Sequence, residues 1–301
     1  MKNLPVLLIA LFMVANQIHA SEKFDPNSSD GIVIGIILND ITNIEKEFAD
    51  FHQLGFGACQ LLYNSDFDKT TAERLKKTSN ESNIKITSLI CLAPGSVWTF
   101  LDGPSTIGLV PRKNRPENVE LFKKAIDFCV MADIPAFHSH FGFIPEDPRD
   151  VLYGEFIDAM RVLANYAKER NIVLYCETGQ ETPITLIRTI RDIGTGNVFI
   201  NCDLANLVLY GKANPLDAVK MFGPLIRQFH AKDGLYPTDP DALGKEVNIP
   251  EGEVNFPEVI RELKRHNFRG AIIIEREFGD NQREYVIRTK KYLEELMSKE
   301  Y

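Results

Sequence analysis

The sequence predicts a single α/β domain, a (β/α)8 TIM barrel, and three observations lead to that prediction. Short apolar segments alternate with longer helical patterns from residue 31 to the end of the 301-residue chain. No Gly-x-Gly-x-x-Gly sequence follows the first apolar segment, as a dinucleotide-binding doubly wound sheet would require. No composition break or Pro/Ser-rich linker divides the chain, so one closed barrel of about 250 residues fits better than two domains.

The elements follow in order along the chain. We expect strands at the short apolar runs 32–38, 59–62, 85–92, 136–140, 173–177, 198–203, 228–232 and 271–275. We expect helices at 44–53, 69–78, 116–131, 150–170, 182–193, 216–222, 257–266 and 282–299. Capping residues such as Asp217 and Asn255 mark helix starts. Two connections, 93–115 and 233–254, are long for βα loops, and such loops are often lids or binding elements.

Composition and charge exclude several classes of protein. Hydrophobic residues make up 44% and charged residues 25% of the chain, which is ordinary for a globular domain and excludes disordered, collagen-like and coiled-coil chains. Lys and Arg number 34 against 42 Asp and Glu, a net charge of −8. That acidic balance argues against a nucleic-acid partner, which normally requires a basic surface, and against binding to anionic lipid.

The first 20 residues have the pattern of a cleavable secretory signal. Lys2 gives a positive start, residues 4–15 form an apolar stretch too short to span a bilayer with margin, and Ala20 ends a small-residue cleavage site. We therefore expect a mature domain of residues 21–301, secreted or periplasmic, with no membrane contact after cleavage. A retained N-terminal anchor is the alternative.

The chain has five cysteines, and every one of them stands within an apolar segment: Cys59, Cys91, Cys129, Cys176 and Cys202. An odd number leaves at least one unpaired. We expect buried free thiols rather than a disulfide framework. No Cys-x-x-Cys spacing exists, so a thiolate zinc site is not expected.

The ends of four successive predicted strands carry an acid or an imidazole. They are Glu177 in VLYCE, Asp203 in VFINCD, His230 in QFHAKD and Glu275 in AIIIERE. In a (β/α)8 barrel the active site lies at these strand ends. Three carboxylates buried together need a counter-charge, so the set predicts a site for Mn²⁺, Mg²⁺, Co²⁺ or Zn²⁺. The alternative is that each acid caps the following helix or pairs with a nearby base.

These stretches resemble those of the xylose isomerase-like TIM barrels, specifically the sugar phosphate isomerase/epimerase family. The matching sequences are VLYCE, NCDLAN, FHAKDG and LGKEVNIPEGEVNFPEVIRELKRHNFRGAIIIERE. The resemblance implies metal ligands at Glu177, Asp203, His230 and Glu275, with Glu177 and Glu275 also acting as the acid/base pair. Many members have His where this chain has Asn206. The loop after strand seven lacks the Asp-x-His of the DNA-repair branch, so a trinuclear zinc endonuclease is not expected.

Other polar residues at the same end are candidates for catalysis. Lys232 is two residues beyond His230 and shares its inward direction, so it is a candidate for stabilising an oxyanion or for a structural ion pair. His140 ends strand four and is a candidate proton relay, with a core histidine as the alternative. Glu277 faces the same way as Glu275 and is the second choice as a ligand.

Four residues are candidates for contacting the substrate. Trp98 is the only tryptophan and lies in the long third loop, where it would stack on a sugar ring or pin the loop to the barrel. Gln180 and Glu181 follow strand five and would reach the sugar or form an ordinary polar loop. His138 lies two residues before His140, faces the same side, and would otherwise be a core histidine.

The sequence therefore predicts an exported, divalent-metal-dependent sugar isomerase or epimerase that removes a proton next to a carbonyl. A free sugar or keto-sugar is the expected substrate, because the chain has a signal segment and no recognisable phosphate cradle. The first alternative is a lyase or hydrolase that cleaves 3-keto-glycosides by elimination. The second is a non-catalytic sugar-binding barrel. The product, the metal and the homo-oligomeric state are left open.

Overall fold

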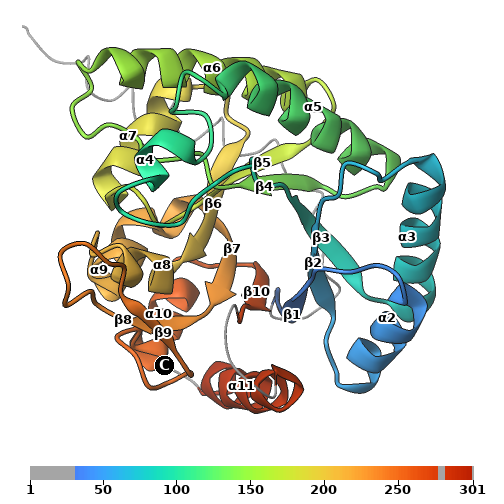
Figure 1. Ribbon diagram of the computed structural model, residues 1–301. Helices are drawn as coiled ribbons and strands as arrows, with labels where there is room; N and C mark the ends of the chain where they lie inside the picture. Colours follow the sequence, from blue (N-terminus) through green and yellow to red (C-terminus); the bar gives the residue numbers. More distant parts are fainter. Residues whose placement is uncertain (1–30, 277–281, 300–301) are drawn as a thin grey trace, which may run out of the picture.

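A closed barrel of parallel strands forms the centre of the computed structural model, which describes residues 31–276 and 282–299. Its strands are β1 (Ile32–Leu38), β2 (Ala58–Leu62), β3 (Lys85–Ile90), β4 (Ala136–Ser139), β5 (Val173–Glu177), β6 (Val198–Asp203), β7 (Ile226–Ala231) and β10 (Gly270–Ile274). Around the ring their order is β1-β10-β7-β6-β5-β4-β3-β2. The predicted fold class is thus confirmed (Figure 1).

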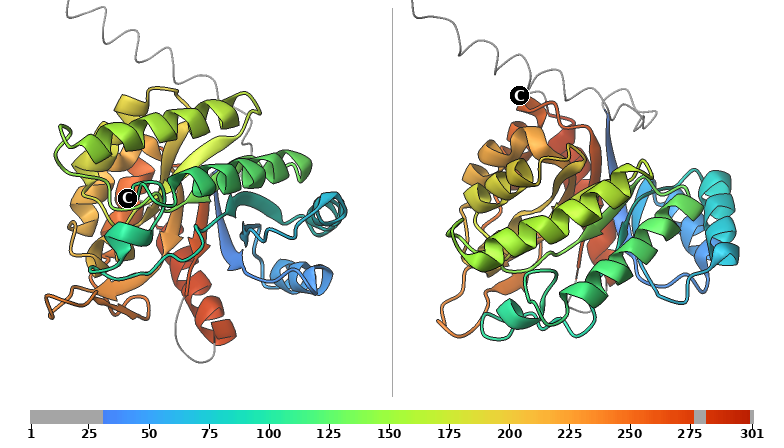
Figure 2. Two further views of the ribbon diagram at one scale, coloured as in Figure 1. Left: turned by 45° about the horizontal axis from the view of Figure 1, so that its top comes forward. Right: turned by 90° about the horizontal axis from the view of Figure 1, so that it is seen from above.

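Helices cover the outside of the barrel, as the two further views show (Figure 2). They are α2 (Ile44–Gln53), α3 (Lys69–Ser82), α5 (Arg115–Met131), α6 (Val151–Lys168), α7 (Pro183–Ile193), α9 (Pro215–Phe222), α10 (Phe256–Arg265) and α11 (Gln282–Met297). One predicted cap is wrong. Asn214, not Asp217, caps the start of α9, because its Oδ1 accepts hydrogen bonds from the backbone N–H groups of Leu216 and Asp217. Asn255 caps α10 as predicted.

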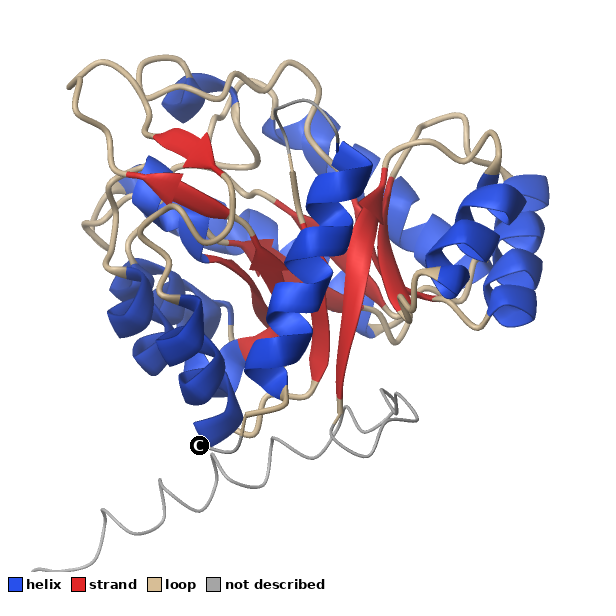
Figure 3. Cartoon of the chain, turned by 90° about the horizontal axis from the view of Figure 1, so that it is seen from below, coloured by secondary structure: helices blue, strands red, loops and turns tan. Residues whose placement is uncertain are grey.

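The two long loops contain short elements that the periodicity did not predict. Helix α4 (Gly103–Thr106) lies in the third loop, and the antiparallel strands β8 (Asp233–Leu235) and β9 (Lys245–Val247) lie in the seventh. A six-residue helix, α8 (Leu204–Leu209), directly follows β6, and a 3-10 turn spans Gly223–Leu225. Figure 3 shows the β8–β9 ribbon standing apart from the barrel strands.

Asp233 fixes the seventh loop to the barrel. Its fully buried carboxylate accepts hydrogen bonds from the backbone N–H groups of Gly234 at 2.9 Å, Gly252 at 2.8 Å and Val254 at 3.0 Å. A Cβ atom at Gly252 would lie 2.2 Å from Asp233 Oδ1, so the approach requires glycine. The loop therefore returns to the residue at which it began.

The hydrophobic core has two parts. The larger lies between strands and helices, and a smaller cluster of Ala58, Ala271 and Ile273 is separate from it. All five cysteines are buried and free, as predicted, and burial raises the pKa of the thiols, that of Cys91 to about 12. No helix in the described ranges is long and apolar enough to cross a membrane. The predicted signal segment, residues 1–20, and Glu277 lie outside the described residues.

Candidate metal centre

The four predicted ligand residues converge at the C-terminal end of the barrel. Glu177 ends β5, Asp203 ends β6, His230 lies in β7 and Glu275 directly follows β10. Parallel pairing places Asp203 opposite His230 in register. One ligand atom from each residue lies within 4.8 Å of the others. Three of the side chains are fully buried, and that of Glu275 is 15% exposed.

His230 Nδ1 is at the centre of this cluster. It lies 2.5 Å from Glu275 Oε2, 3.0 Å from Glu177 Oε1 and 3.8 Å from Asp203 Oδ2. Despite these distances, His230 Nδ1, Asp203 Oδ2 and Glu275 Oε2 make no hydrogen bond of acceptable geometry within the described part of the chain. Burial opposes charge on His230, but Glu177 and Glu275 outweigh it and raise the pKa of the imidazole well above its ordinary value.

This arrangement fits a divalent cation. Buried polar atoms normally have hydrogen-bond partners, and a cation held between these three atoms would give a partner to each of them. Three carboxylates and one imidazole form a donor set that suits Mn²⁺, Mg²⁺, Co²⁺ or Zn²⁺.

Glu177 is held by donors on both carboxylate oxygens. Its Oε2 accepts hydrogen bonds from His138 Nε2 at 2.5 Å and from Asn201 Nδ2, and its Oε1 accepts one from Asn206 Nδ2 at 3.3 Å. Burial raises the pKa of Glu177, but the neighbouring His230 and His138 outweigh burial and hold that pKa well below the usual range. His138, predicted as a substrate contact, therefore lies against a candidate ligand.

Asp203 combines two roles that the sequence presented as alternatives. Its Oδ1 accepts a hydrogen bond from the Asn206 backbone N–H at 2.8 Å and so caps α8. Its Oδ2 instead faces the cluster. Burial raises the pKa of Asp203, yet Lys232 and His230 outweigh burial and lower it. Helix capping thus uses one oxygen and leaves the other for a cation.

Lys232 is fully buried between two acids of the cluster. Its Nζ lies 3.3 Å from Glu275 Oε1 and 3.4 Å from Asp203 Oδ2, so the ion pair that the sequence offered as an alternative is present. Burial raises the pKa of Glu275 above its usual value by more than the charges of Lys232 and His230 lower it. Glu275 is therefore the carboxylate in the cluster that accepts a proton most readily.

His140, Gln180 and Trp98 come from three different βα loops, and His140 contacts each of the other two. His140 Nδ1 lies 3.3 Å from Gln180 Oε1, and its ring centroid lies 4.7 Å from that of Trp98 with the rings tilted by 65°. Loss of solvent around the ring lowers the pKa of His140 to about 4, so the imidazole is neutral at pH 7. Trp98 is 38% exposed. Gln180 is buried, and its Nε2 makes no hydrogen bond among the residues described.

Glu181 is buried in the loop that follows β5. Its side-chain Oε1 has no hydrogen-bond partner in residues 31–276 and 282–299. Burial raises the pKa of this carboxyl to about 8, so it carries its proton at pH 7. Glu181 stands four residues beyond Glu177, and the charge of Glu177 adds to the rise in its pKa.

A buried polar layer, which the sequence patterns did not predict, lies beside the cluster. It consists of side chains from β2, β3, β6 and β7 that hydrogen-bond to one another: Gln60, Ser88, Asn201 and Gln228. Asn201 and Gln228 each stand two residues before a candidate ligand, so they face the same side of their strands. A polar residue at that spacing in an otherwise apolar strand is the signal that would have found them.

Comparison with known proteins agrees with this architecture. The family model described as "Xylose isomerase-like TIM barrel" matches residues 48–296. A curated relative, an uncharacterized protein of Methanocaldococcus jannaschii, is 26% identical over 195 residues. That match covers 61% of this chain and 63% of the relative, so the chain spans less than two thirds of the relative's length.

Solved structures show the same fold. A xylose isomerase domain protein from Planctomyces limnophilus is 26% identical with a TM-score of 0.81, and the match covers 87% of this chain and 96% of that one. L-ribulose 3-epimerase is 15% identical, with a TM-score of 0.70 and coverage of 88% and 94%. A xylose isomerase-like TIM barrel protein from Mycobacterium smegmatis, solved in complex with magnesium, is 17% identical, with a TM-score of 0.65 and coverage of 88% and 96%.

Proposed function

Because the chain belongs to the xylose isomerase-like TIM barrel family, we propose that it is a divalent-metal-dependent sugar isomerase or epimerase. Its reaction removes a proton from the carbon next to the carbonyl of a free sugar or keto-sugar. The observation that carries this proposal is the convergence of Glu177, Asp203, His230 and Glu275. The facing atoms of three of them, Asp203, His230 and Glu275, lack hydrogen-bond partners among the described residues.

These four residues would hold the ion. When bound there, a divalent ion supplies Lewis acidity that polarises a carbonyl and an adjacent hydroxyl, which acidifies the C–H bond beside the carbonyl. The chain's own contribution is to hold the ligand atoms in fixed orientations at a site that is buried away from water. Two of the ligands are fixed by hydrogen bonds from the barrel itself, Glu177 through Asn201 and Asp203 through the start of α8.

Glu275 is the proposed proton acceptor. It is the one member of the cluster with a partly exposed side chain, and burial raises its pKa toward the range in which a carboxylate works as a base. Glu177 is the proposed second proton carrier. Because donors occupy both of its oxygens, Glu177 takes up a proton less readily than Glu275 does. Return of the proton to the opposite face gives epimerisation, and return to the neighbouring carbon gives isomerisation.

The remaining polar groups fit the handling of a sugar. The Lys232 ammonium provides a buried positive charge beside Glu275, suited to stabilising an oxyanion on the substrate. Gln180 Nε2 is a buried donor without a partner in the described part of the chain, suited to a sugar hydroxyl. Trp98 and His140 form a partly exposed aromatic pair that suits the apolar face of a sugar ring.

Proton exchange with solvent tests the proposal directly. Metal-loaded protein is incubated in D₂O with a panel of free sugars, keto-sugars and 3-keto-glycosides, and NMR follows each C–H signal. We expect deuterium at the carbon next to the carbonyl of at least one sugar, and no exchange after chelation. Exchange in metal-free protein, or release of an aglycone without formation of an isomer, would contradict an isomerase or epimerase.

We also propose that the protein is exported after cleavage behind Ala20. The support is the pattern of residues 1–20, and export favours a free sugar over a phosphorylated one. Mass spectrometry of the protein purified from its native cells should find Ser21 as the first residue. An intact N-terminus on soluble cytosolic protein would overturn export and remove the objection to sugar phosphates.

A further inference from the structure

We infer that Gln60 is a positioning residue for the proposed metal centre, because its side-chain amide selects which ring nitrogen of His230 carries the proton. The inference rests on the proposed metal-dependent function. It concerns a residue on β2, a strand that supplies no member of the metal cluster. In the barrel, β1 and β10 separate β2 from the strand that carries His230.

Gln60 reaches across the barrel interior to His230. Its Oε1 lies 2.7 Å from His230 Nε2, on the far side of the ring from the metal cluster. Its Nε2 donates to Gln228 Oε1 at 2.6 Å and to Asn201 Oδ1 at 3.2 Å. Gln60, Asn201, Gln228 and His230 are at most 2% exposed, so each of their polar atoms depends on protein partners rather than on water.

The direction of each hydrogen bond follows from the Glu177 carboxylate at one end of the chain of contacts. An ionised carboxylate only accepts, so Asn201 must turn its Nδ2 toward Glu177 and its Oδ1 toward Gln60. Gln60 must then turn its Nε2 toward Asn201 and its Oε1 toward His230. An amide oxygen also only accepts, so His230 Nε2 must carry a proton. In the neutral ring, Nδ1 then presents its lone pair to the cluster.

Two further contacts hold Gln60 in this orientation. Gln228 Oε1 accepts from Gln60 Nε2 and also from Ser88 Oγ, the latter at 3.0 Å. If the Gln60 amide rotated by 180°, its NH₂ group would face the N–H of His230 and its oxygen would face two acceptor oxygens. Each mismatch leaves a buried polar group unpaired, which costs about 1–3 kcal/mol. Gln60 therefore holds the ring of His230 in the metal-binding tautomer.

A polar residue that only fills space in the core would affect stability and nothing else. A positioning residue also sets the protonation pattern of His230 and, through it, the affinity for the ion. The two roles are separated by replacing Gln60 with Leu, which removes the acceptor, and with Glu, which keeps an acceptor oxygen toward His230 but gives up the donor to Gln228 and Asn201. Thr87→Val is the matched control, because Thr87 Oγ1 makes a buried hydrogen bond to the Cys59 carbonyl, next to Gln60 but outside the polar layer.

The experiment uses full-length protein labelled with ¹⁵N-histidine and loaded with Zn²⁺, which is diamagnetic. His230 signals are assigned by their loss in a His230→Gln variant. The wild type should show a proton on Nε2 and a zinc-ligated Nδ1. Gln60→Leu should lose the hydrogen-bonded Nε2 proton signal and bind Zn²⁺ roughly 10–100-fold more weakly in competition titrations. Gln60→Glu should keep the wild-type nitrogen pattern, and Thr87→Val should change neither readout.

The outcomes distinguish this inference from the proposed function. If the wild type binds none of Zn²⁺, Mn²⁺, Mg²⁺ or Co²⁺, the proposed metal-dependent function fails, and the inference that rests on it fails too. If the wild type binds Zn²⁺ and Gln60→Leu matches it in affinity and nitrogen pattern, the inference alone is overturned. If Gln60→Leu does not fold, Gln60→Glu decides: a changed nitrogen pattern in that variant also overturns the inference.

Discussion

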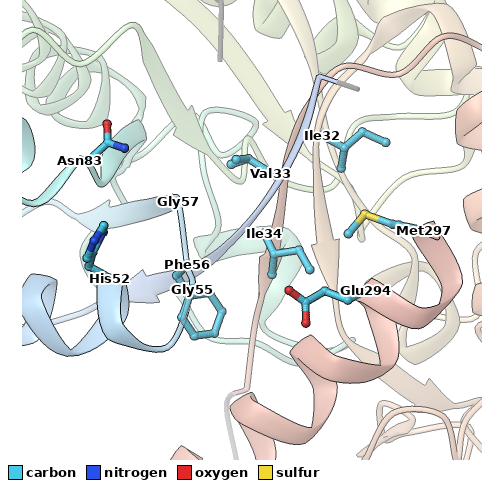
Figure 4. Close-up of a pocket in the computed structure, with 10 residues that line it drawn as sticks. All are labelled: Ile32, Val33, Ile34, His52, Gly55, Phe56, Gly57, Asn83, Glu294 and Met297. Atoms are coloured by element: carbon cyan, nitrogen blue, oxygen red, sulfur yellow. The ribbon is translucent and has the colours of Figure 1, made fainter. Parts of the chain in front are cut away.

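The two ends of this barrel differ in the side chains that line them. At the N-terminal end, a cavity of about 330 Å³ is bounded by the start of β1, the turn before β2 and the end of α11. Figure 4 shows side chains such as Val33, Phe56 and Met297 around it. At the C-terminal end, the carboxylates of Glu177, Asp203 and Glu275 lie within 3.8 Å of His230 Nδ1.

An empty cavity by itself is therefore a poor guide to the reactive end of this barrel. The lining of the N-terminal cavity is mostly apolar side chains and backbone, and its titratable members, His52 and Glu294, are exposed to water. The C-terminal cluster instead holds buried ligand atoms that no hydrogen bond within the described ranges satisfies. In (β/α)8 barrels generally, the C-terminal face carries function and the N-terminal face carries stability.

The largest effect should come from Glu275→Gln. The amide can still offer an oxygen to an ion but cannot accept the substrate proton, so turnover should fall by ~10²–10⁴ and added metal should not restore it. Exchange of the substrate α-proton with D₂O should disappear as well, as NMR would show. Met297→Leu at the opposite end is the control. Equal loss in both variants would erase the distinction between the two ends.

Glu177→Gln should separate the two proton carriers. Because Glu275 remains as the acceptor, exchange of the α-proton with D₂O should persist at a reduced rate, while little epimerised or isomerised product forms. NMR in D₂O measures both quantities in one sample. Loss of exchange in Glu177→Gln together with its survival in Glu275→Gln would reverse the assignment of the first base.

His230→Gln should weaken metal binding rather than remove a proton carrier. Its ring is proposed as a ligand only, so the expected result is a lower affinity in titration calorimetry and activity that excess metal partly restores. The effect on turnover at saturating metal should be smaller than that of Glu275→Gln. A variant that stays inactive at any metal concentration would give His230 a direct part in catalysis.

Replacing Glu181 should have a smaller effect, on the way that the free energy of unfolding depends on pH. The pKa of Glu181 is about 8 in the folded protein and lies near 4.5 in the unfolded chain. Between those values the unfolded chain releases a proton that the folded protein keeps, so this group reduces stability as the pH rises from about 4.5 to 8. Glu181→Gln should therefore gain on the order of 1–3 kcal/mol at pH 8 over wild type. Denaturant titrations at pH 5 and 8 should show the gain growing with pH.

The smallest effect should follow Met297→Leu at the N-terminal cavity. The exchange nearly conserves volume, so the free energy of unfolding should change by less than about 1.5 kcal/mol. Metal affinity and turnover should equal those of wild type. A clear loss of activity in this variant would show that the N-terminal cavity takes part in function.

The sequence predicted the barrel and the meeting of the candidate ligands because both depend on local patterns. Strand and helix periodicity is visible in short windows, and parallel strand ends necessarily meet on one face. Gln60 could not be found this way, because its partner His230 is 170 residues distant in the chain. The β8–β9 ribbon was missed because its strands are short and Asp233 anchors the loop through backbone groups 19 and 21 residues away.

The cap of α9 was assigned wrongly for a related reason. Asn214 and Asp217 flank Pro215 at the helix start, and both residue types occur in the first turn of helices. Only the side-chain geometry shows that Asn214 accepts the hydrogen bonds. His138 likewise faces the barrel interior as predicted, but its contact with Glu177 depends on the distance between two strands that the sequence does not state.

The five buried thiols allow opening of the barrel to be followed by chemical labelling. No disulfide contributes to the barrel, so its formation requires no oxidant and a reducing agent should leave it intact. Because burial suppresses the thiolate, an alkylating reagent reacts only when the core opens. The rate at which cysteines acquire the label therefore measures how often the barrel opens, and mass spectrometry of labelled peptides can report separately on the strands or helices that carry Cys59, Cys91, Cys129, Cys176 and Cys202.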